Sequence, residues 1–196
     1  MRRAVLLDKD GTLIEDVPYN VDPALIRLAP GVGEALRALH GAGYILAVVT
    51  NQSGVARGLF PESALEGVEA RLRELLAAEG VPLSGFYACP HHPEGTVAEY
   101  ARDCDCRKPQ PGLLRRAAEE LDLDLSASWM VGDILNDVEA GGRAGCWTVL
   151  LDTGGETEWV PGPYRTPEVT ARNWSEVAAA ILAAEQEGRA DALRTS

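Results

Sequence analysis

Residues 4–12 read AVLLDKDGT, and this stretch decides the fold class. Its first four residues are apolar without interruption, which is typical of a strand that is buried on both faces of a parallel sheet. The apolar run ends at Asp8, and Asp10, Gly11 and Thr12 follow at once. A buried strand that ends in two carboxylates and a tight turn predicts a polar site at the edge of a sheet.

Short apolar runs that alternate with helical patterns recur along the rest of the chain. The residue pattern predicts further strands at 45–49, 86–88, 129–131 and 147–151. Helical patterns fall at 32–39, 63–80, 111–121, 137–144 and 175–188. This alternation predicts an α/β protein with a mostly parallel sheet between helices.

The composition is that of an acidic globular domain. The chain has 196 residues, of which 18 are Lys or Arg and 30 are Asp or Glu, so its formal net charge is −12. We expect one domain over residues 1–188 and a flexible tail at 189–196. The acidic balance argues against nucleic acid and membrane surfaces as partners. We expect a cytoplasmic protein, because the N-terminal apolar run is too short for a secretory signal. We also expect a monomer.

Polar residues follow three of the predicted strands, and the carboxyl ends of parallel strands meet at one edge of a sheet. Asp8 and Asp10 follow the first strand and Asp133 follows the fourth. Because buried carboxylates need a cation and Mg²⁺ prefers oxygen ligands, these three acids are candidate magnesium ligands. The turn after the second strand offers donors that suit phosphate oxygens, from Thr50, Asn51, Gln52 and Ser53.

Each of these signals also has a plain structural interpretation. The acids at 8–11 fit an ordinary Asx turn, and Asn136 or Asp137 fits the N-cap of a helix. Lysine gives a further signal, since only Lys9 and Lys108 occur among the 18 basic residues. Arg and Lys are not interchangeable, so we expect Lys108 to neutralise charge at the site rather than to form an exposed basic pair with Arg107.

Residues 89–106 contain four ligands typical of zinc. Cys89 and His91 are followed, after twelve residues, by Cys104 and Cys106. This spacing predicts a closed tetrahedral site of structural zinc that staples a long loop, and His92 is an alternative ligand to His91. A reduced cluster without metal is the other interpretation. The fourth cysteine, Cys146, is expected to be a small core residue.

Together, D-x-D-G-T at 8–12, the Thr50-Asn51 turn, Lys108 and G-D-x-x-x-D at 132–137 resemble the haloacid dehalogenase (HAD) superfamily of phosphohydrolases. The resemblance implies a three-layer Rossmann-like fold without a large cap domain. It also implies that Asp8 forms an aspartyl-phosphate and that Asp10 is the general acid and base. Thr50 and Lys108 would then bind the phosphoryl group, and Asp133 would help to hold Mg²⁺.

The zinc loop is similar to that of one branch of the superfamily, which contains heptose bisphosphate phosphatases and histidinol phosphatases. This implies a small phosphorylated sugar, with the 7-phosphate of a heptose 1,7-bisphosphate preferred over histidinol phosphate or a broader range of sugar phosphates. Arg107 would recognise the distal part of the substrate, and Asp16 and Tyr19 would contact it. Ile134 replaces a lysine that is common in the branch, which bears on the choice of substrate. The alternative from another class is a zinc-stapled binding module without catalysis.

Overall fold

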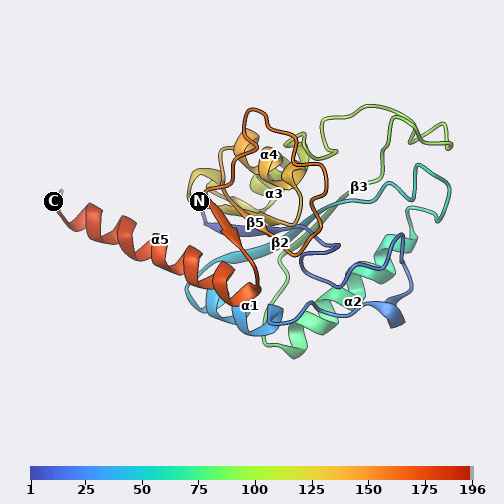
Figure 1. The fold of residues 1–196 in the computed structure, drawn as a ribbon. Coiled ribbons are helices and arrows are strands. Elements are labelled where there is room, and N and C mark those ends of the chain that lie inside the picture. Colours follow the sequence, from blue (N-terminus) through green and yellow to red (C-terminus); the bar gives the residue numbers. More distant parts are fainter. Residues whose placement is uncertain (195–196) are drawn as a thin grey trace.

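A parallel sheet of six strands forms the centre of the fold (Figure 1). The structure is a computed structural model that describes the backbone of residues 1–194 and the side chains of residues 1–186. In sheet order the strands are β3 (Gly85–Cys89), β2 (Ile45–Asn51), β1 (Ala4–Leu7), β4 (Trp129–Gly132), β5 (Trp147–Leu151) and β6 (Val169–Ala171). All five neighbouring pairs are parallel.

Helices cover both faces of this sheet, which confirms the predicted three-layer α/β architecture (Figure 1). One face carries α1 (Val32–Gly41), α2 (Ala64–Ala78) and α5 (Trp174–Arg194), and the other carries α3 (Gly112–Leu121) and α4 (Leu135–Ala144). In β1, Val5 and Leu7 point to the first group, whereas Ala4 and Leu6 point to the second. Because both faces are buried, alternate positions are equally apolar and the strand reads as one continuous run.

The order of the strands places the site. From β1 the chain moves outward through β2 to β3, and it then returns to β4, next to β1, before moving outward the other way. Ligands of such sheets bind outside the carboxyl ends of the strands where the order reverses. Asp8 and Asp133 directly follow β1 and β4, and the Asp8 amide donates to the Val131 carbonyl at 2.9 Å.

The structure differs from the sequence prediction at the edge of the sheet and near the C-terminus. Strand β6 was not predicted, because three residues are too few to show a period within a polar stretch. Helix α5 is assigned up to Arg194, beyond the predicted end at 188. The predicted tail at 189–196 lies outside the residues whose side chains are described, so it stays a prediction, as does the single-domain boundary.

The segment 90–111 contains no helix or strand, as the sequence analysis expected for the zinc loop. Two short 3₁₀ helices, Pro23–Leu25 and Leu125–Ala127, lie in other connections. Over the part of the chain that the structure describes, no helix combines the length and the apolar character that a membrane crossing needs.

Candidate active site

A buried ammonium group lies at the centre of the site. The Lys108 side chain reaches the carboxyl end of β1, where its Nζ is 2.5 Å from Asp8 Oδ1 and 2.6 Å from Asp137 Oδ1. It also donates a hydrogen bond to the Val49 carbonyl at 2.9 Å. Burial acts to lower the pKa of Lys108, but the carboxylates of Asp137 and Asp8 outweigh it and raise this pKa above its ordinary value.

Three buried carboxylates surround one side of this ammonium. Oxygens of Asp8, Asp133 and Asp137 all lie within 4.8 Å of one another. Burial, aided by Asp137 and Asp133 and opposed by Lys108, raises the pKa of Asp8 well above its usual range. Burial and then Asp137 raise the pKa of Asp133 to about 7. One ammonium cannot offset three carboxylates, so the donor set fits a bound divalent cation with a preference for oxygen, such as Mg²⁺.

Asp133 is held by the turn that follows β1. Thr12 Oγ1 donates to Asp133 Oδ1 at 3.2 Å. Gly11 adopts φ of 75° and its backbone packs so closely on the Asp133 carboxylate that a Cβ there would overlap an oxygen. Glycine is therefore needed at position 11 both for the turn and for the close approach.

Asp10, the second acid of the first motif, is not part of the group formed by Asp8, Asp133 and Asp137. Its oxygens accept from Lys9 Nζ at 2.6 Å and from Gln52 Nε2 at 3.0 Å. Asp10 was predicted as a magnesium ligand, and for its side chain that role stays a prediction. The third carboxylate of the cluster is Asp137, the second acid of the G-D-x-x-x-D motif, which was not among the predicted magnesium ligands and for which a helix cap was the alternative interpretation. The G-D-x-x-x-D spacing contained the signal, because it puts both acids at the start of one helix.

Polar residues at the end of β2 and in the turn after it line the site beside Asp10. Gln52 Nε2 donates to both Asp10 and Thr50 Oγ1, the latter at 2.9 Å. Asn51 was expected to contact phosphate, but its amide is engaged by the Lys108 backbone: Asn51 Nδ2 donates to Lys108 O and Lys108 N donates to Asn51 Oδ1, each at 3.0 Å. Thus Asn51 fixes the position of Lys108.

A cavity of about 280 Å³ opens beside Asp10. Asp16 and Tyr19 line it from the loop after β1, and Ser53 lines it from the turn after β2, so the structure brings these predicted substrate contacts together. Arg107 lines a neighbouring cavity of about 360 Å³ that also borders Lys108. Lys108 borders the second of these cavities, and Asn51, which bonds the Lys108 backbone, lines the first.

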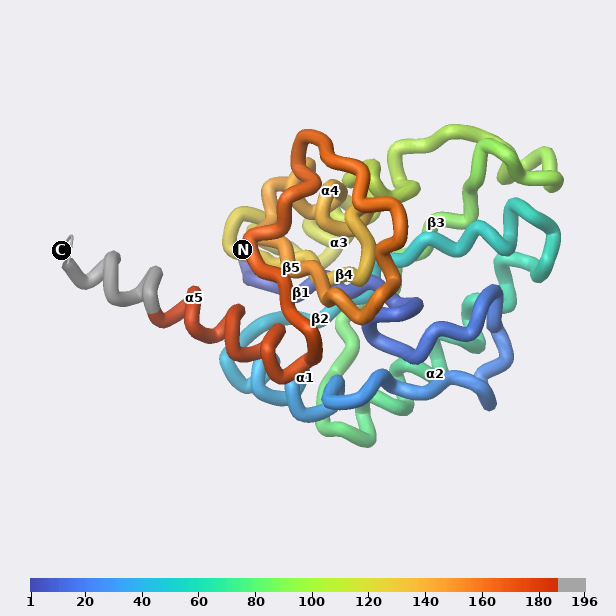
Figure 2. The backbone as a smooth tube through the Cα atoms, in the orientation of Figure 1, coloured from blue at the N-terminus to red at the C-terminus, as the bar shows by residue number. Residues whose placement is uncertain are grey.

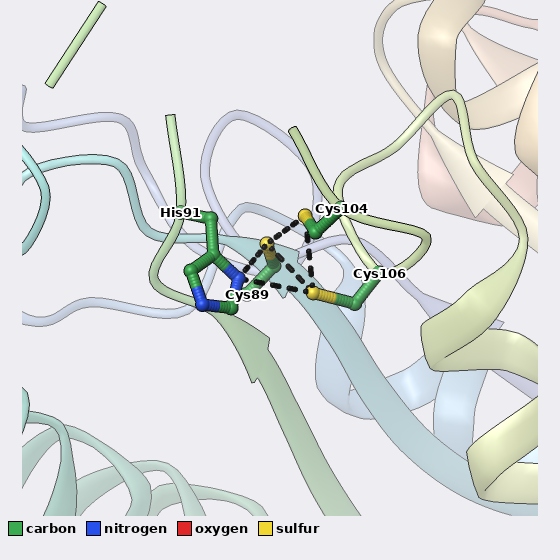
Figure 3. Close-up of side chains that lie close together, drawn as sticks. All are labelled: Cys89, His91, Cys104 and Cys106. Carbon is green, nitrogen blue, oxygen red and sulfur yellow. Dashed lines mark hydrogen bonds between the residues drawn. The ribbon is translucent and has the colours of Figure 1, made fainter. Parts of the chain in front are cut away.

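The predicted zinc ligands converge in the loop 90–111 and the end of β3 (Figure 3). The three Sγ–Sγ distances are 3.1, 3.3 and 3.6 Å, and His91 Nδ1 lies 3.4 Å from Cys106 Sγ and 3.7 Å from Cys89 Sγ. Tetrahedral ligands around zinc, with Zn–S bonds of about 2.3 Å, lie roughly 3.8 Å apart. The four donors therefore need little movement to close around zinc.

The cluster contains His91 and not His92. His92 Nδ1 accepts from the Glu94 amide at 3.1 Å, and its Nε2 faces Arg57 Nη2 at 3.3 Å. Within the cluster, hydrogen bonding from Cys89 and then from His91 lowers the pKa of Cys106 to about 5, whereas the hydrogen bond to Cys106 raises the pKa of Cys89 and burial raises that of Cys104. A thiol that is ionised at neutral pH is the form that binds zinc.

Comparisons with known proteins agree with this geometry. A family model described as HAD-hydrolase-like matches residues 105–176. A HAD-like phosphatase from Mesorhizobium loti has a similar structure, with a TM-score of 0.80 and 41% identity over 93% of this chain and 85% of that one. The chain belongs to the HAD-like hydrolases.

The relatives narrow this class to one family. The D-glycero-beta-D-manno-heptose-1,7-bisphosphate 7-phosphatases of Salmonella typhi and Escherichia coli K12 are each 45% identical over 152 residues, which are 77% of this chain and 81% and 80% of those enzymes. The D,D-heptose 1,7-bisphosphate phosphatase of B. bronchiseptica, solved with magnesium and phosphate, aligns with a TM-score of 0.73 and 32% identity over 92% of this chain and 98% of that one. Within the HAD-like hydrolases, this chain is a member of the heptose bisphosphate phosphatase family.

Proposed function

We propose that the protein is a phosphomonoesterase that removes the 7-phosphate from D-glycero-D-manno-heptose 1,7-bisphosphate. The names of its relatives support this substrate. The observation that carries the chemistry is the buried Lys108 ammonium, 2.5 Å from Asp8, at the reversal of strand order. A cation in this place neutralises a phosphoryl group that the Asp8 carboxylate would otherwise repel.

In the first step an oxygen of Asp8 attacks phosphorus and the bond from phosphorus to the sugar oxygen breaks. Asp10 donates a proton to the departing sugar oxygen, so the sugar leaves as a neutral alcohol. Asp10 lies in the cavity wall beside Gln52, where a substrate hydroxyl would be released. Thr50 and Lys108 hold oxygens of the transferring group in line with Asp8.

In the second step the aspartyl-phosphate is hydrolysed. Asp10, now ionised, accepts a proton from water while the water oxygen attacks phosphorus, and the bond to Asp8 breaks. Inorganic phosphate and the original carboxylates are the products. Each proton that Asp10 gives in the first step is recovered in the second, so the enzyme returns to its starting state.

The two metals have different roles in this proposal. Asp8 and Asp133, with Asp137 close by, would hold Mg²⁺, which when bound would supply positive charge for the phosphoryl oxygens. Zinc is structural, because four protein ligands leave no open position. By fixing the loop 90–111, the zinc cluster carries Arg107 and Lys108 to the site, and Arg107 then recognises the distal phosphate or hydroxyls of the substrate.

The same arrangement supports further parts of the proposal. We further propose that the enzyme is a monomer. Zinc-binding thiolates are maintained in a reducing compartment, which fits the cytoplasm. Asp16 and Tyr19, in the wall of the cavity beside Asp10, would contact the sugar.

A substrate panel with Mg²⁺ tests the proposed function. Heptose 1,7-bisphosphate should give the highest kcat/KM, well above histidinol phosphate and simple sugar monophosphates. Equal kcat/KM for histidinol phosphate and the heptose bisphosphate would defeat the assignment of substrate. Asp8→Asn should lose nearly all turnover on every substrate while the fold, measured by circular dichroism, is retained. Full turnover of this variant would defeat the mechanism.

A further inference from the structure

The segment between β5 and β6, residues 152–168, runs along α4 (Figure 2, orange). It is attached to that helix at two places. Glu156 accepts from the Leu135 amide at 2.7 Å. Arg165 Nη1 donates to Asn136 Oδ1 at 3.0 Å and to Glu139 Oε2 at 2.7 Å. The segment is therefore bound to the N-terminal half of the helix that follows Asp133.

Glu156 provides a hydrogen-bond acceptor for the N-terminus of α4, which the residue before the helix cannot provide. The N-cap position is occupied by Ile134, whose side chain has no acceptor for the first free amides of the helix. The Glu156 carboxylate supplies one from a distance of 21 positions along the chain. Its other oxygen accepts from the amides of Glu158 and Trp159 at 2.8 and 3.4 Å, so the same side chain also shapes its own loop.

The residue before Glu156 lies against the carboxylate cluster. The backbone of Gly155 packs on the Asp133 carboxylate so closely that a Cβ at this position would overlap one of its oxygens. Asp133 is thus enclosed between two glycine backbones, Gly11 from the first motif and Gly155 from this segment. The position of the segment and the position of Asp133 are consequently linked.

The first turn of α4 determines the geometry of the charged cluster. Asp133 precedes the helix by two residues, and Asp137 lies in its first turn, with an oxygen 2.6 Å from Lys108 Nζ. Asp137 Oδ2 faces the Ile134 amide at 3.3 Å, so this acid contributes to the helix start as well as to the ion pair. If the Leu135 amide loses Glu156, the turn that orients both acids loses the hydrogen bond that ties its backbone to segment 152–168.

We propose that Glu156 is a positioning residue for the Mg²⁺ site. It acts through its hydrogen bond with the Leu135 amide and through the packing of the Gly155 backbone against the Asp133 carboxylate. The inference builds on the carboxylate cluster of the proposed function and adds to it a segment to which the sequence assigned no role. Groups hydrogen-bonded behind metal ligands commonly change metal affinity by ~10–100-fold when they are removed. Glu156 contacts the Leu135 amide, two positions after Asp133, and not the ligand itself. We therefore expect the lower end of that range, about tenfold.

The test compares Glu156 with a matched acid of the same loop. Glu156→Ala and Glu156→Gln are measured beside Glu158→Ala and Glu158→Gln, since the Glu158 side chain has no partner among the described hydrogen bonds and ion pairs. Binding of Mn²⁺ as a probe for Mg²⁺ is followed by electron paramagnetic resonance, and the Mg²⁺ concentration for half-maximal turnover is measured in parallel. Thermal unfolding without metal reports the purely structural effect of each change.

Glu156→Ala should weaken Mn²⁺ binding and raise the half-maximal Mg²⁺ concentration by about tenfold. Glu156→Gln should lie between, because its amide oxygen still accepts from Leu135, and both Glu158 variants should bind Mn²⁺ as the wild type does. Folded Glu156→Ala with unchanged Mn²⁺ affinity would overturn the inference. If that variant fails to fold, Glu156→Gln decides, and an affinity equal to that of Glu158→Gln would overturn it. Because Mn²⁺ binding needs no substrate, a protein that binds Mn²⁺ but fails on heptose bisphosphate would refute the proposed function alone.

Discussion

Asn51 and Lys108 hold each other through two hydrogen bonds across 57 positions of the chain. Both bonds use the backbone of Lys108 and the amide of Asn51, each at 3.0 Å. The end of β2 therefore determines where the zinc loop returns to the sheet. From this anchored backbone the Lys108 side chain extends to Asp8 and Asp137. Asn51, whose contact with phosphate stays a prediction, thus also anchors the residue that carries the buried ammonium.

Replacing Asn51 should therefore impair catalysis by displacing Lys108. Asn51→Ala removes both bonds, and a misplacement of about 1 Å can cost ~10²-fold in rate, so we expect kcat to fall by up to that factor. Asn51→Asp retains the acceptor but not the donor and should lie between. Asp124→Ala is the control, because Asp124 accepts from the Ser126 amide at 3.0 Å in the connection before β4, at the amino end of the sheet. It should lower Tm without changing kcat, and an equal kcat for Asn51→Ala would contradict the prediction.

The ion pairs of Lys108 should be needed for stability as well as for turnover. Lys108→Ala leaves Asp8 and Asp137 buried without their cation, and breaking a buried pair in this way costs about 3–5 kcal/mol of unfolding free energy. Urea unfolding in the absence of Mg²⁺ measures the loss. Adding Asp137→Asn to Lys108→Ala should restore part of the stability and none of the activity. Arg116→Ala breaks the exposed pair with Glu120 and should have little effect on either.

Much of the fold and part of the site could be predicted from the sequence, because local rules govern them. The apolar run at 4–7 and the alternation of strands and helices indicate a parallel sheet, and its geometry brings Asp8, Thr50 and Asp133 to one edge. The zinc ligands were predictable because four of them lie close in sequence. Because His91 and His92 are adjacent residues of the same type, only the path of the loop shows which of them is the fourth zinc ligand.

The parts that were not predicted depend on contacts between distant segments. Asn51 could be assigned to phosphate or to Lys108 only once the return path of the loop 90–111 was known. Asp137 satisfies a helix start and an ion pair at once, and sequence spacing indicates the first role as readily as the second. The segment 152–168 has no regular period, so its attachment to α4 through Glu156 leaves no local pattern.

Zinc should be lost when a ligand of the cluster is replaced, but not when the fourth cysteine is. Cys106→Ser removes one of four ligands and should abolish stoichiometric zinc, lower Tm and reduce turnover, since the loop that carries Lys108 loses its staple. Cys146→Ser is the matched change, because Cys146 is a buried cysteine outside the cluster. It should retain one zinc per chain by atomic absorption. Full zinc content in Cys106→Ser would refute the assigned cluster.

The reactivity of the thiols toward a disulfide reagent should distinguish Cys106 of the zinc cluster from the buried Cys146. Burial raises the pKa of Cys146 to about 12, so its thiol is protonated at pH 8 and a poor nucleophile. With zinc bound, a disulfide reagent should find almost no rapidly reacting thiol, and chelation should expose Cys106, whose pKa is lowered to about 5, while Cys146 stays slow. Because the thiolate is the reactive form, the rate at Cys146 should rise about tenfold for each pH unit below its pKa. Rapid reaction at Cys146 in the zinc-loaded protein at pH 8 would contradict its burial.

Trp174 should link the last helix to the catalytic turn. Its Nε1 donates to the Thr12 carbonyl at 3.0 Å, and Trp174 and Thr12 are both buried. Trp174→Phe leaves this carbonyl without a partner, at a cost of about 1–3 kcal/mol in unfolding free energy. Because Thr12 also orients Asp133, kcat should fall as well. Trp147→Phe is the control, since Trp147 donates to the Ser126 carbonyl at 3.1 Å but is half exposed and far from the motif. A stability loss at Trp174 without any loss of kcat would mean that Thr12 holds Asp133 independently of α5.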